Sequence, residues 1–454
     1  MRILVVGGGA REHVIAETLS RSGEIYSVMK NRNPGIARLA TEFLLHPETD
    51  VEKVRDFAVE KKIDLAVIGP ESALEVGIVD VLAEAGIPAA GPNMAAARIE
   101  TSKIFMREIM EQYKIPGRAR YRVFGAGDGT EGMREFIEEC GEVAVKPVGL
   151  TGGKGVKVMG TTEQLKDADE AIAFAREVLE KKIGGADKVV MEERLIGEEV
   201  TIQGFCDGTT VVTTPAAQDH PHAYEGDHGP ITGGMGSYSQ PDRLLPFLTQ
   251  GDYDSAVTTM QATIDAMRKE GAPYHGILYG QFVLTKDGPK VVEFNARFGD
   301  PEAMNILPLL KGDFADICMR IAKGGLAEGD CGKETGSEIV DFAKKATVCK
   351  YVVPTGYGVK SIAGKPITVD EQAIRDLGAR YYYSSVNETD EGILTTSSRS
   401  VGIVGFGDTL QEAEHMAEEA LKFVSGEEIF VRHDIATPPS LQKRIRHMEE
   451  VRKG

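Results

Sequence analysis

The sequence has few cysteines and no apolar run long enough to cross a bilayer. The five cysteines form no Cys-x-x-Cys motif and are far apart, at Cys140, Cys206, Cys318, Cys331 and Cys349. This spacing indicates neither a disulfide framework nor a zinc site, so we expect reduced thiols. Residues 1–2 lead directly into a short apolar strand rather than into a signal peptide. We therefore expect a cytoplasmic protein with no membrane partner.

Positive charge is also scarce, because 52 lysines and arginines face 70 acidic residues and give a formal net charge of −18. Such an excess of negative charge repels nucleic acid, so we expect no nucleic-acid partner. An anionic substrate would need a local cluster of cations or backbone N–H groups. The 454 residues, 42% hydrophobic and 27% charged, are typical of a globular chain with roughly three domains.

The segment 289–302 carries the densest group of chemically useful side chains. A β-rich run ends in Glu293-x-Asn295-x-Arg297, and alternation along a strand places these three side chains on one face. A carboxylate, an amide oxygen and a guanidinium would then share a site suited to Mg²⁺ bound mainly through nucleotide phosphates. This pattern indicates a nucleotide-dependent ligase. The alternative is an exposed amphipathic strand with an Arg297–Asp300 ion pair in the next turn.

The strand that precedes this segment, at 279–284, is joined to it by a hairpin turn at 285–288. If the two strands pair, Gln281 faces the same site as Glu293. Its amide oxygen would then be a third ligand for a metal ion.

The first hundred residues alternate strands and helices, which predicts a parallel, doubly wound sheet with its binding crevice at the carboxyl ends of the strands. The glycine turn 7–9 after the first strand would leave backbone N–H groups free to face an anion. Glu12 stands where the dinucleotide fingerprint needs a third small residue. We therefore expect a phosphate cradle for a smaller ligand, with Arg11 adding charge; a plain tight turn is the alternative. Glu71 would contact a ribose hydroxyl or an amine, or would only favour a helix dipole.

The strand predicted at 143–147 carries Lys146, which is costly to bury without a partner, so a phosphate is a better partner than solvent. The glycine-rich loop 149–155 is no Walker loop, since no Ser or Thr follows Lys154. We interpret it as a flap that closes over phosphates, with a plain hairpin turn as the alternative. The acidic segment 192–199 could bind adenine and ribose, or could be an exposed turn.

Residues 218–238 predict a long polar loop, and its glycines favour close approach to a ligand. Its three histidines have no metal-ligand spacing, so we do not expect them to bind a metal. The tail from Ser440 predicts a basic helix with a solvated surface rather than a nucleic-acid contact.

Together these stretches resemble the phosphoribosylamine–glycine ligases (glycinamide ribonucleotide synthetases), a family of the ATP-grasp superfamily, over nearly the whole chain. The most specific parts are 295–302 and 229–236. The resemblance implies an α/β fold of the ATP-grasp type in three domains. These are an N-terminal, doubly wound substrate-binding domain (1–101), an ATP-grasp domain (102–325, with a flap subdomain at about 121–190) and a C-terminal mixed α/β domain (326–454).

The resemblance also implies roles for single residues. ATP would be bound by Lys103, Lys146, Gly153, Lys154, Glu192, Glu193, Leu195 and Glu199. One or two Mg²⁺ or Mn²⁺ ions would be bound by Gln281, Glu293 and Asn295. Glycine and 5-phosphoribosylamine would be bound by Gly9, Arg11, Glu12, Glu71, Asp219, Gly233, Gly234 and Arg297. The catalytic residues would be Arg297, Lys146 and Asp219.

The implied reaction joins glycine to 5-phosphoribosylamine through glycyl phosphate and releases ADP and phosphate, in a monomer or a homodimer. The chain departs from the family pattern at Pro221, where the family usually has lysine, at Ile231, where it has asparagine, and in the turn 31–35. Other ATP-grasp ligases or carboxylases are the nearest alternative. A nicotinamide-dependent oxidoreductase is opposed by Glu12, and a nucleotide-sensing module by Glu293.

Overall fold

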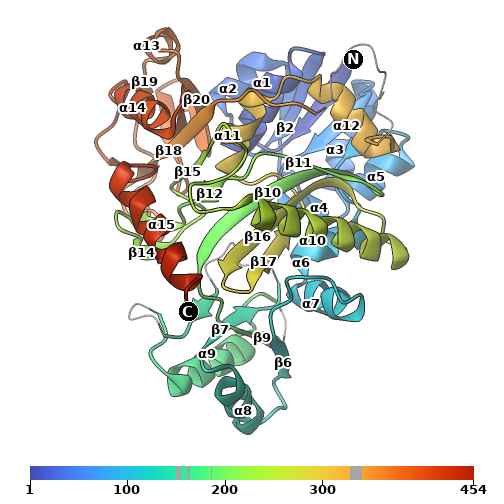
Figure 1. The fold of residues 1–454 in the computed structure, drawn as a ribbon. Coiled ribbons are helices and arrows are strands. Elements are labelled where there is room, and N and C mark those ends of the chain that lie inside the picture. The colour runs from blue at the N-terminus through green and yellow to red at the C-terminus, as the bar shows by residue number, and fades with distance from the viewer. Residues whose placement is uncertain (150–154, 161–163, 186, 328–339) are drawn as a thin grey trace.

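The computed structural model describes residues 1–149, 155–160, 164–185, 187–327 and 340–454 and has an α/β fold (Figure 1). Among these residues, four sheets have four or more strands. Within the same ranges, no helix is both long and apolar enough to cross a membrane.

The N-terminal part forms a parallel sheet of five strands in the order β3-β2-β1-β4-β5. The winding reverses between β1 and β4, so the carboxyl ends of these strands border a crevice. This confirms the predicted doubly wound sheet. Its strands are β1 (Arg2–Val6), β2 (Glu24–Met29), β3 (Ala40–Leu45), β4 (Leu65–Ile68) and β5 (Ala89–Ala90). The helices of this part are α1 (Ala10–Leu19), α2 (Pro34–Leu39), α3 (Val51–Glu60), α4 (Glu71–Glu75), α5 (Ile78–Glu84) and α6 (Met94–Thr101).

A small antiparallel sheet with the strand order β6-β9-β7-β8 follows α7 (Lys103–Gln112), and it lies at the bottom of Figure 1. Helices α8 and α9 pack against it and share a separate hydrophobic cluster with it, in which Phe136, Val145 and Val178 are buried. This unit is therefore a layer with its own core. Its elements are β6 (Tyr121–Gly125), α8 (Thr130–Cys140), β7 (Val143–Pro147), β8 (Lys157–Val158), α9 (Ala168–Lys181) and β9 (Lys188–Glu193).

The central sheet has the order β11-β10-β16-β17, and α10 packs against it. Strands β16 and β17 form the predicted hairpin, with Thr285 paired to Gly288. One extra residue, Val292, bulges from β17 because Gln281 pairs with Glu293 while Phe282 pairs with Val291. The elements are β10 (Glu198–Asp207), β11 (Val211–Thr213), α10 (Gln250–Lys269), β16 (His275–Thr285) and β17 (Gly288–Asn295), followed by α11 (Glu302–Ile306), the 3-10 helix η1 (Leu307–Leu309) and α12 (Phe314–Lys323).

The C-terminal sheet has the order β12-β15-β18-β23-β20, with β25 also paired to β18. Helix α14 covers β18 and β23. A two-stranded sheet of β19 and β24 and the hairpin β21-β22 complete this part. The elements are β18 (Ala346–Pro354), β19 (Thr368–Val369), α13 (Glu371–Asp376), β20 (Arg380–Tyr383), β21 (Val386–Thr389), β22 (Gly392–Thr395), β23 (Val401–Gly407), α14 (Leu410–Leu421), β24 (Val424–Ser425), β25 (Ile429–Val431) and α15 (Pro438–Val451).

The prediction of one long loop at 218–238 is wrong. These residues form β12 (Gln218–Asp219), the hairpin β13 (His222–Tyr224) and β14 (His228–Ile231), and β15 (Gly236–Ser239). Strand β15 pairs with β18, so part of this segment belongs to the C-terminal sheet. Frequent glycines and short strands hide this pairing from the local sequence.

The prediction of a solvated C-terminal helix is also wrong for one face of α15. Met448 is buried, and Arg452 donates hydrogen bonds to the Phe247 carbonyl oxygen at 2.9 Å and to Asp252 at 2.8 Å. The helix therefore docks on the rest of the chain. Its acidic partners lie far away in sequence, so the basic composition of the tail does not reveal them.

Candidate active site

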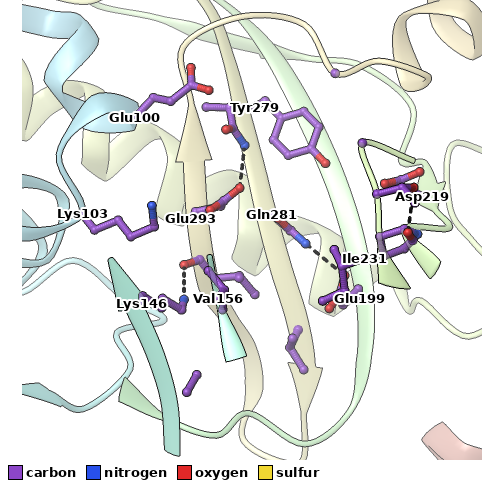
Figure 2. A pocket seen from close by; sticks show the side chains of 18 of the residues that line it. Glu100, Lys103, Lys146, Val156, Glu199, Asp219, Ile231, Tyr279, Gln281 and Glu293 are labelled. Carbon is purple, nitrogen blue, oxygen red and sulfur yellow. Dashed lines mark hydrogen bonds between the residues drawn. The ribbon is translucent and has the colours of Figure 1, made fainter. Parts of the chain in front are cut away.

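A cavity of about 480 Å³ is lined by residues from the small antiparallel sheet, the central sheet and the C-terminal sheet, and from helices α1, α4, α6, α7 and α11. In the view of Figure 2, Lys103 and Lys146 lie on one side of Glu293 and Gln281. Glu199, Ile231 and Asp219 lie on the other side. Cations and carboxylates thus face one enclosed space.

Glu293 and Gln281 lie opposite each other on β17 and β16, as the strand pairing predicts. Asn295 donates a hydrogen bond to Glu293 at 3.3 Å, and Gln281 donates one to Glu199 at 3.0 Å. One carboxylate flanked by two amide oxygens is a donor set that fits Mg²⁺. Within the described ranges, no group of three or more His, Cys, Asp or Glu side chains could hold a metal ion. A cation here would therefore need nucleotide phosphates as further ligands.

Lys146 is buried on β7, and its ammonium lies 2.7 Å from a carboxylate oxygen of Glu192 on β9. Arg107 of α7 binds the same carboxylate through two nitrogens, at 2.7 and 2.6 Å. Burial would raise the pKa of Glu192, but Arg107 and Lys146 outweigh it and lower the pKa to about 2. The bulged Val292 carbonyl accepts hydrogen bonds from Lys146 at 3.3 Å and from Arg107 at 3.0 Å.

These contacts add to two predictions. Lys146 has a carboxylate partner in Glu192 and also lines the cavity, where a phosphate is predicted to bind it. The Glu192 carboxylate is engaged by two cations, which it anchors, and its contact with adenine stays a prediction. Lys103 donates a hydrogen bond to the Gly149 carbonyl oxygen at 3.3 Å, and burial lowers its pKa. Two lysines are thus held at one wall for an anion.

Arg297 lies between two carboxylates, Glu71 at 3.4 Å and Glu100 at 3.2 Å. The alternative interpretation, an Arg297–Asp300 pair in an exposed turn, is therefore wrong, and Asp300 pairs with Arg399. Burial would raise the pKa of Glu71, but Arg297 and Arg11 lower it to about 2. Burial raises the pKa of Glu100 to about 7, although Arg297 opposes this shift. Two acids beside one arginine thus have pKa values on opposite sides of the usual value.

Glu100 also holds the backbone after β17. Its second carboxylate oxygen accepts a hydrogen bond from the Ala296 N–H at 2.6 Å. The local sequence gave no sign of this role, because the two residues are 196 positions apart.

Two acids lie on the opposite wall, the buried Glu302 and the partly buried Asp219. The Glu302 carboxylate accepts a hydrogen bond from the Tyr279 hydroxyl at 2.7 Å. The Asp219 carboxylate accepts one from the backbone N–H of His220, also at 2.7 Å. Burial raises the pKa of both carboxyls, and the nearby Glu302 raises that of Asp219 further. This wall therefore favours a partner that is cationic or donates hydrogen bonds.

Asp300 forms an ion pair with Arg399 of the C-terminal part at 3.1 Å. Arg399 also donates hydrogen bonds to the Gly234 carbonyl oxygen at 3.3 Å and to the Asp300 carbonyl oxygen at 2.6 Å. Gly234 has a φ of +104°, and a Cβ there would collide with Asp219 and Pro301. Only glycine fits this position, which explains part of the Gly-Gly-Met-Gly sequence.

The N-terminal glycine turn does not offer the predicted free N–H at Gly9. The Glu12 carboxylate turns back and accepts a hydrogen bond from the Gly9 N–H at 2.7 Å and another from Arg11 at 2.7 Å. Gly7 and Gly69, at the ends of β1 and β4, have no room for a Cβ because Glu12 fills the crevice there. Glu12 therefore closes the turn internally, and only Arg11 of this group lines the cavity.

The cavity brings together most of the predicted site residues. Those that line it are Arg11, Glu71, Lys103, Lys146, Glu192, Glu193, Leu195, Glu199, Asp219, Gly233, Gln281, Glu293, Asn295 and Arg297. Gly9, Glu12 and Gly234 are not among the lining residues. Gly153 and Lys154 lie outside the described residues.

Seven polar lining residues were not among the predicted site residues: Glu100, Arg194, Thr232, Tyr279, Asp300, Glu302 and Arg399. Asp300 and Glu302 directly follow Arg297 in the signature segment, so their position could have drawn attention to them. Arg399 has no such local signal, since it reaches the site from the C-terminal part.

An apolar wall lies beside the two lysines and is lined by Ala144, Val156, Val158, Leu195, Val283 and Val292. A flat heterocycle with polar edges suits such a surface. Pro221 and Ile231, where the chain departs from the family pattern, also line the cavity.

The small α/β layer and the central antiparallel sheet enclose two lysines, an apolar wall and the Glu293–Asn295 pair. This arrangement defines an ATP-grasp enzyme. Family models assign the chain more closely. The chain belongs to the phosphoribosylglycinamide synthetase family: the model of its N domain matches residues 1–100, that of its ATP-grasp (A) domain residues 101–303, and that of its C domain residues 347–438.

Individual relatives agree with this assignment. The chain is 55% identical to a phosphoribosylamine–glycine ligase of Methanothermobacter thermautotrophicus over 100% of both chains. It is 52% identical to the enzyme of that name from Methanobrevibacter smithii, over 99% of this chain and 100% of that one. The crystal structure of a phosphoribosylamine–glycine ligase from Thermotoga maritima has a TM-score of 0.78 and 27% identity, and the match covers 96% of this chain and 100% of that one.

Proposed function

We propose that the protein is an ATP-dependent ligase that joins glycine to 5-phosphoribosylamine and forms glycinamide ribonucleotide, ADP and phosphate, a step of purine biosynthesis. One observation supports this most: a single cavity joins the Lys103, Lys146 and Glu293 group to Arg297, Arg11 and Glu71. The first group suits a nucleotide triphosphate, and the second suits an anionic substrate that carries an amine. The names of the full-length relatives agree with this chemistry.

The chemistry needs an activated carboxylate. Glycine's carboxylate is a poor electrophile, and it becomes reactive when one of its oxygens takes the γ-phosphate of ATP and forms glycyl phosphate. The amine of phosphoribosylamine then attacks the carbonyl carbon and forms the new C–N bond. The C–O bond to the phosphate breaks, phosphate leaves with that oxygen, and the amine nitrogen loses a proton. No enzyme nucleophile is required.

The protein's part is binding and electrostatics. Lys103 and Lys146 hold the phosphates, and Arg297 stabilises the charge that develops near glycine. Gln281, Glu293 and Asn295 would hold one or two divalent cations, which neutralise phosphate charge when bound. Glu71 is ionised at neutral pH because its pKa is about 2, so it is suited to accept hydrogen bonds from an amine or a ribose.

The remaining assignments follow the same division of the cavity. Leu195 and the apolar wall would hold adenine, with Glu193 beside it, and Glu199 would hold the ribose. Asp219 with Gly233 and Gly234 would hold glycine or its partner, although Gly234 acts through Asp219. Lys154 and Gly153 stay predictions, as do the domain limits 1–101, 102–325 and 326–454, the choice between Mg²⁺ and Mn²⁺, the cytoplasmic location and the oligomeric state.

The test is ADP release by the purified protein with ATP and Mg²⁺. Glycine and freshly generated phosphoribosylamine are added separately and then together. Release that needs both supports the ligase. Release driven by a different carboxylate would keep the ATP-grasp chemistry and overturn the substrates. No ADP release with any carboxylate tested would overturn the proposed function.

A further inference from the structure

The C-terminal helix α15 carries a basic side chain that reaches toward the cavity walls. Arg444 contacts two acids at once, Glu198 at 2.7 Å and Asp227 at 3.2 Å, and only 13% of its side chain is exposed. The helix begins at Pro438, where the match to the family's C domain ends. Its contacts are therefore not described by the family domains that match the chain.

The first of these acids is one residue away from the cavity. Glu198 and Glu199 are successive residues of β10, so their side chains point to opposite faces. Glu199 lines the cavity and accepts a hydrogen bond from Gln281 at 3.0 Å. Both carboxylate oxygens of Glu198 are held by α15, one by Arg444 and the other by His447 at 2.6 Å. The helix thus fixes the start of β10 from its outer side.

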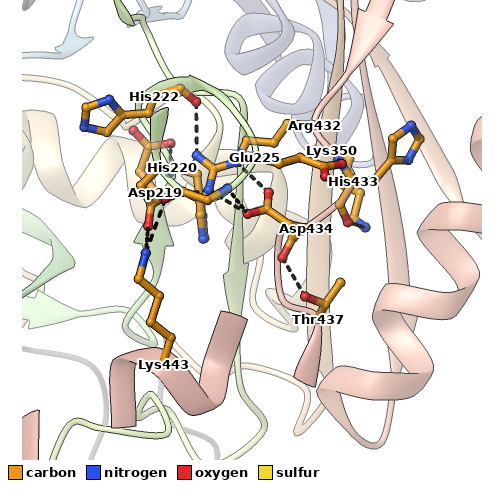
Figure 3. Close-up of polar contacts among 12 residues, drawn as sticks. Asp219, His220, His222, Glu225, Lys350, Arg432, His433, Asp434, Thr437 and Lys443 are labelled. Atoms are coloured by element: carbon orange, nitrogen blue, oxygen red, sulfur yellow. Dashed lines mark hydrogen bonds and ion pairs between the residues drawn. The ribbon is translucent and has the colours of Figure 1, made fainter. Parts of the chain in front are cut away.

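The second acid lies at the turn of the β13-β14 hairpin. Besides Arg444, Asp227 contacts Arg432 at 2.7 Å and Lys443 at 3.3 Å. The Asp434 carboxylate accepts a hydrogen bond from the Gly226 N–H at 2.8 Å. Figure 3 shows Arg432, Asp434 and Lys443 gathered around this turn. The C-terminal segment therefore contacts the turn of the hairpin with several charged side chains.

The other end of the same hairpin reaches the cavity. Pro221 precedes β13, and Ile231 ends β14; both line the cavity, as do Thr232 and Gly233. A short two-stranded hairpin has little stability of its own, so its position depends on what holds its ends. Arg444 is thus bound both to the strand that carries Glu199 and to the hairpin that carries Ile231.

We propose that Arg444 is a positioning residue for the nucleotide, which holds β10 and the β13-β14 hairpin at one fixed separation across the cavity. The inference rests on the proposed function, since Glu199 and Gln281 are assigned there to ATP and its metal ion. A guanidinium has a planar fork that binds two carboxylates in fixed directions. Without it, Glu198 and Asp227 lose their shared cation, and the two walls no longer have a common support.

A purely structural role predicts a different result. If α15 only stabilises the fold, loss of Arg444 lowers the melting temperature and leaves the affinity for the nucleotide unchanged. The experiment therefore measures both quantities. Arg446 on the exposed face of the same helix provides a matched control.

The test compares Arg444→Met, Arg444→Lys and Arg446→Met in the full-length protein. The Kd of ADP with Mg²⁺ is measured by isothermal titration calorimetry, together with the melting temperature. We expect Arg444→Met to weaken ADP binding about fivefold to tenfold, the range expected for a coupled residue outside the ligand contacts. Arg446→Met should have no effect. Arg444→Lys should restore only part of the affinity, because one ammonium cannot bind both acids in the same geometry.

An unchanged Kd for Arg444→Met, with or without a lower melting temperature, would overturn the proposal. If Arg444→Met does not fold, Asp227→Asn keeps the shape and removes one of the two charges. An ADP affinity in Asp227→Asn equal to that of the wild type would then overturn the proposal, and a weaker one supports it. ADP binding needs neither glycine nor phosphoribosylamine, so failure of the proposed reaction leaves this test readable.

Discussion

The ammonium of Lys146 and the carboxylate of Glu192 lie 2.7 Å apart on neighbouring strands of the small layer. Arg107 binds the same carboxylate from α7, so the acid is shared by two cations. Lys146 is thereby held at the cavity wall before any ligand arrives. A cation that is already in place pays no reorganisation cost when phosphate charge develops.

Replacing Lys146 by methionine should therefore slow the reaction strongly without unfolding the protein. Glu192 keeps Arg107 as a partner, so no buried acid is left unpaired. We expect kcat to fall about 100-fold to 1,000-fold, the usual cost of one preorganised charge-stabilising group. Steady-state ADP release measures this effect. Lys188→Met, at the exposed start of β9, is the control, and a loss under about threefold in Lys146→Met would remove Lys146 from the mechanism.

Glu293→Ala should abolish turnover while the fold stays intact. Glu293 is the one carboxylate of the Gln281, Glu293 and Asn295 group, so its loss leaves only amide oxygens for a divalent cation. ADP release is measured across a Mg²⁺ titration, and circular dichroism reports the fold. Glu108→Gln on the exposed side of α7 is the control. Near-normal activity of Glu293→Ala at low Mg²⁺ would contradict the metal assignment.

Arg297→Lys should weaken glycine binding and leave ADP binding nearly unchanged, because Arg297 lies in the part of the cavity assigned to glycine. A lysine cannot keep both the Glu71 and the Glu100 contacts, because its ammonium lacks the planar fork. We expect the KM for glycine to rise about tenfold to 100-fold, the effect of a lost charge-assisted hydrogen bond. The Kd of ADP should stay within about twofold of wild type, since Arg297 contacts no nucleotide group in this account. Equal weakening of glycine and ADP binding would contradict this assignment and show that Arg297 supports the cavity as a whole.

Glu100→Gln should change how stability depends on pH. Burial raises the pKa of Glu100 to about 7 in the folded chain, above the ordinary value of 4.5, so the folded state binds a proton more tightly than the unfolded state. Its contribution to stability is full below about pH 4.5 and is lost as the pH rises through about 7. Glutamine does not titrate. As the pH rises from about 4.5 to about 8, the free energy of unfolding of Glu100→Gln should therefore increase relative to that of wild type by up to about 3 kcal/mol.

Urea unfolding of both proteins at several pH values measures this difference. The comparison cancels other titrating groups, such as His13, whose pKa burial lowers to about 4. A difference that stays constant with pH, or that favours wild type as the pH rises, would contradict the assigned environment of Glu100.

The sequence was sufficient to predict the strands and their pairing where the contacts that form them are local. Alternation along 289–295 and the turn at 285–288 predicted the pairing of Gln281 with Glu293, and the strand–helix alternation predicted the parallel sheet. Such patterns depend on backbone geometry alone. They were less informative for the segment 218–238, where strand β15 pairs with β18, more than a hundred residues away.

The partners of buried charges could not be predicted. The Glu12 carboxylate fills the crevice that the glycine turn was predicted to leave for a ligand, and Glu192 binds both Arg107 and Lys146. Which charges meet depends on packing between distant elements, since a buried ion needs a partner but its sequence position does not name one. The docked face of α15 was missed for the same reason.

The most direct test of the central claim follows the oxygen atoms of glycine. Glycine labelled with oxygen-18 in its carboxylate is incubated with the protein, ATP, Mg²⁺ and phosphoribosylamine, and the released phosphate is analysed by mass spectrometry. Activation through glycyl phosphate predicts one labelled oxygen in each phosphate, because the carboxylate oxygen that takes the γ-phosphate leaves with it. Phosphate that contains no label, formed at the same rate as product, would contradict the account.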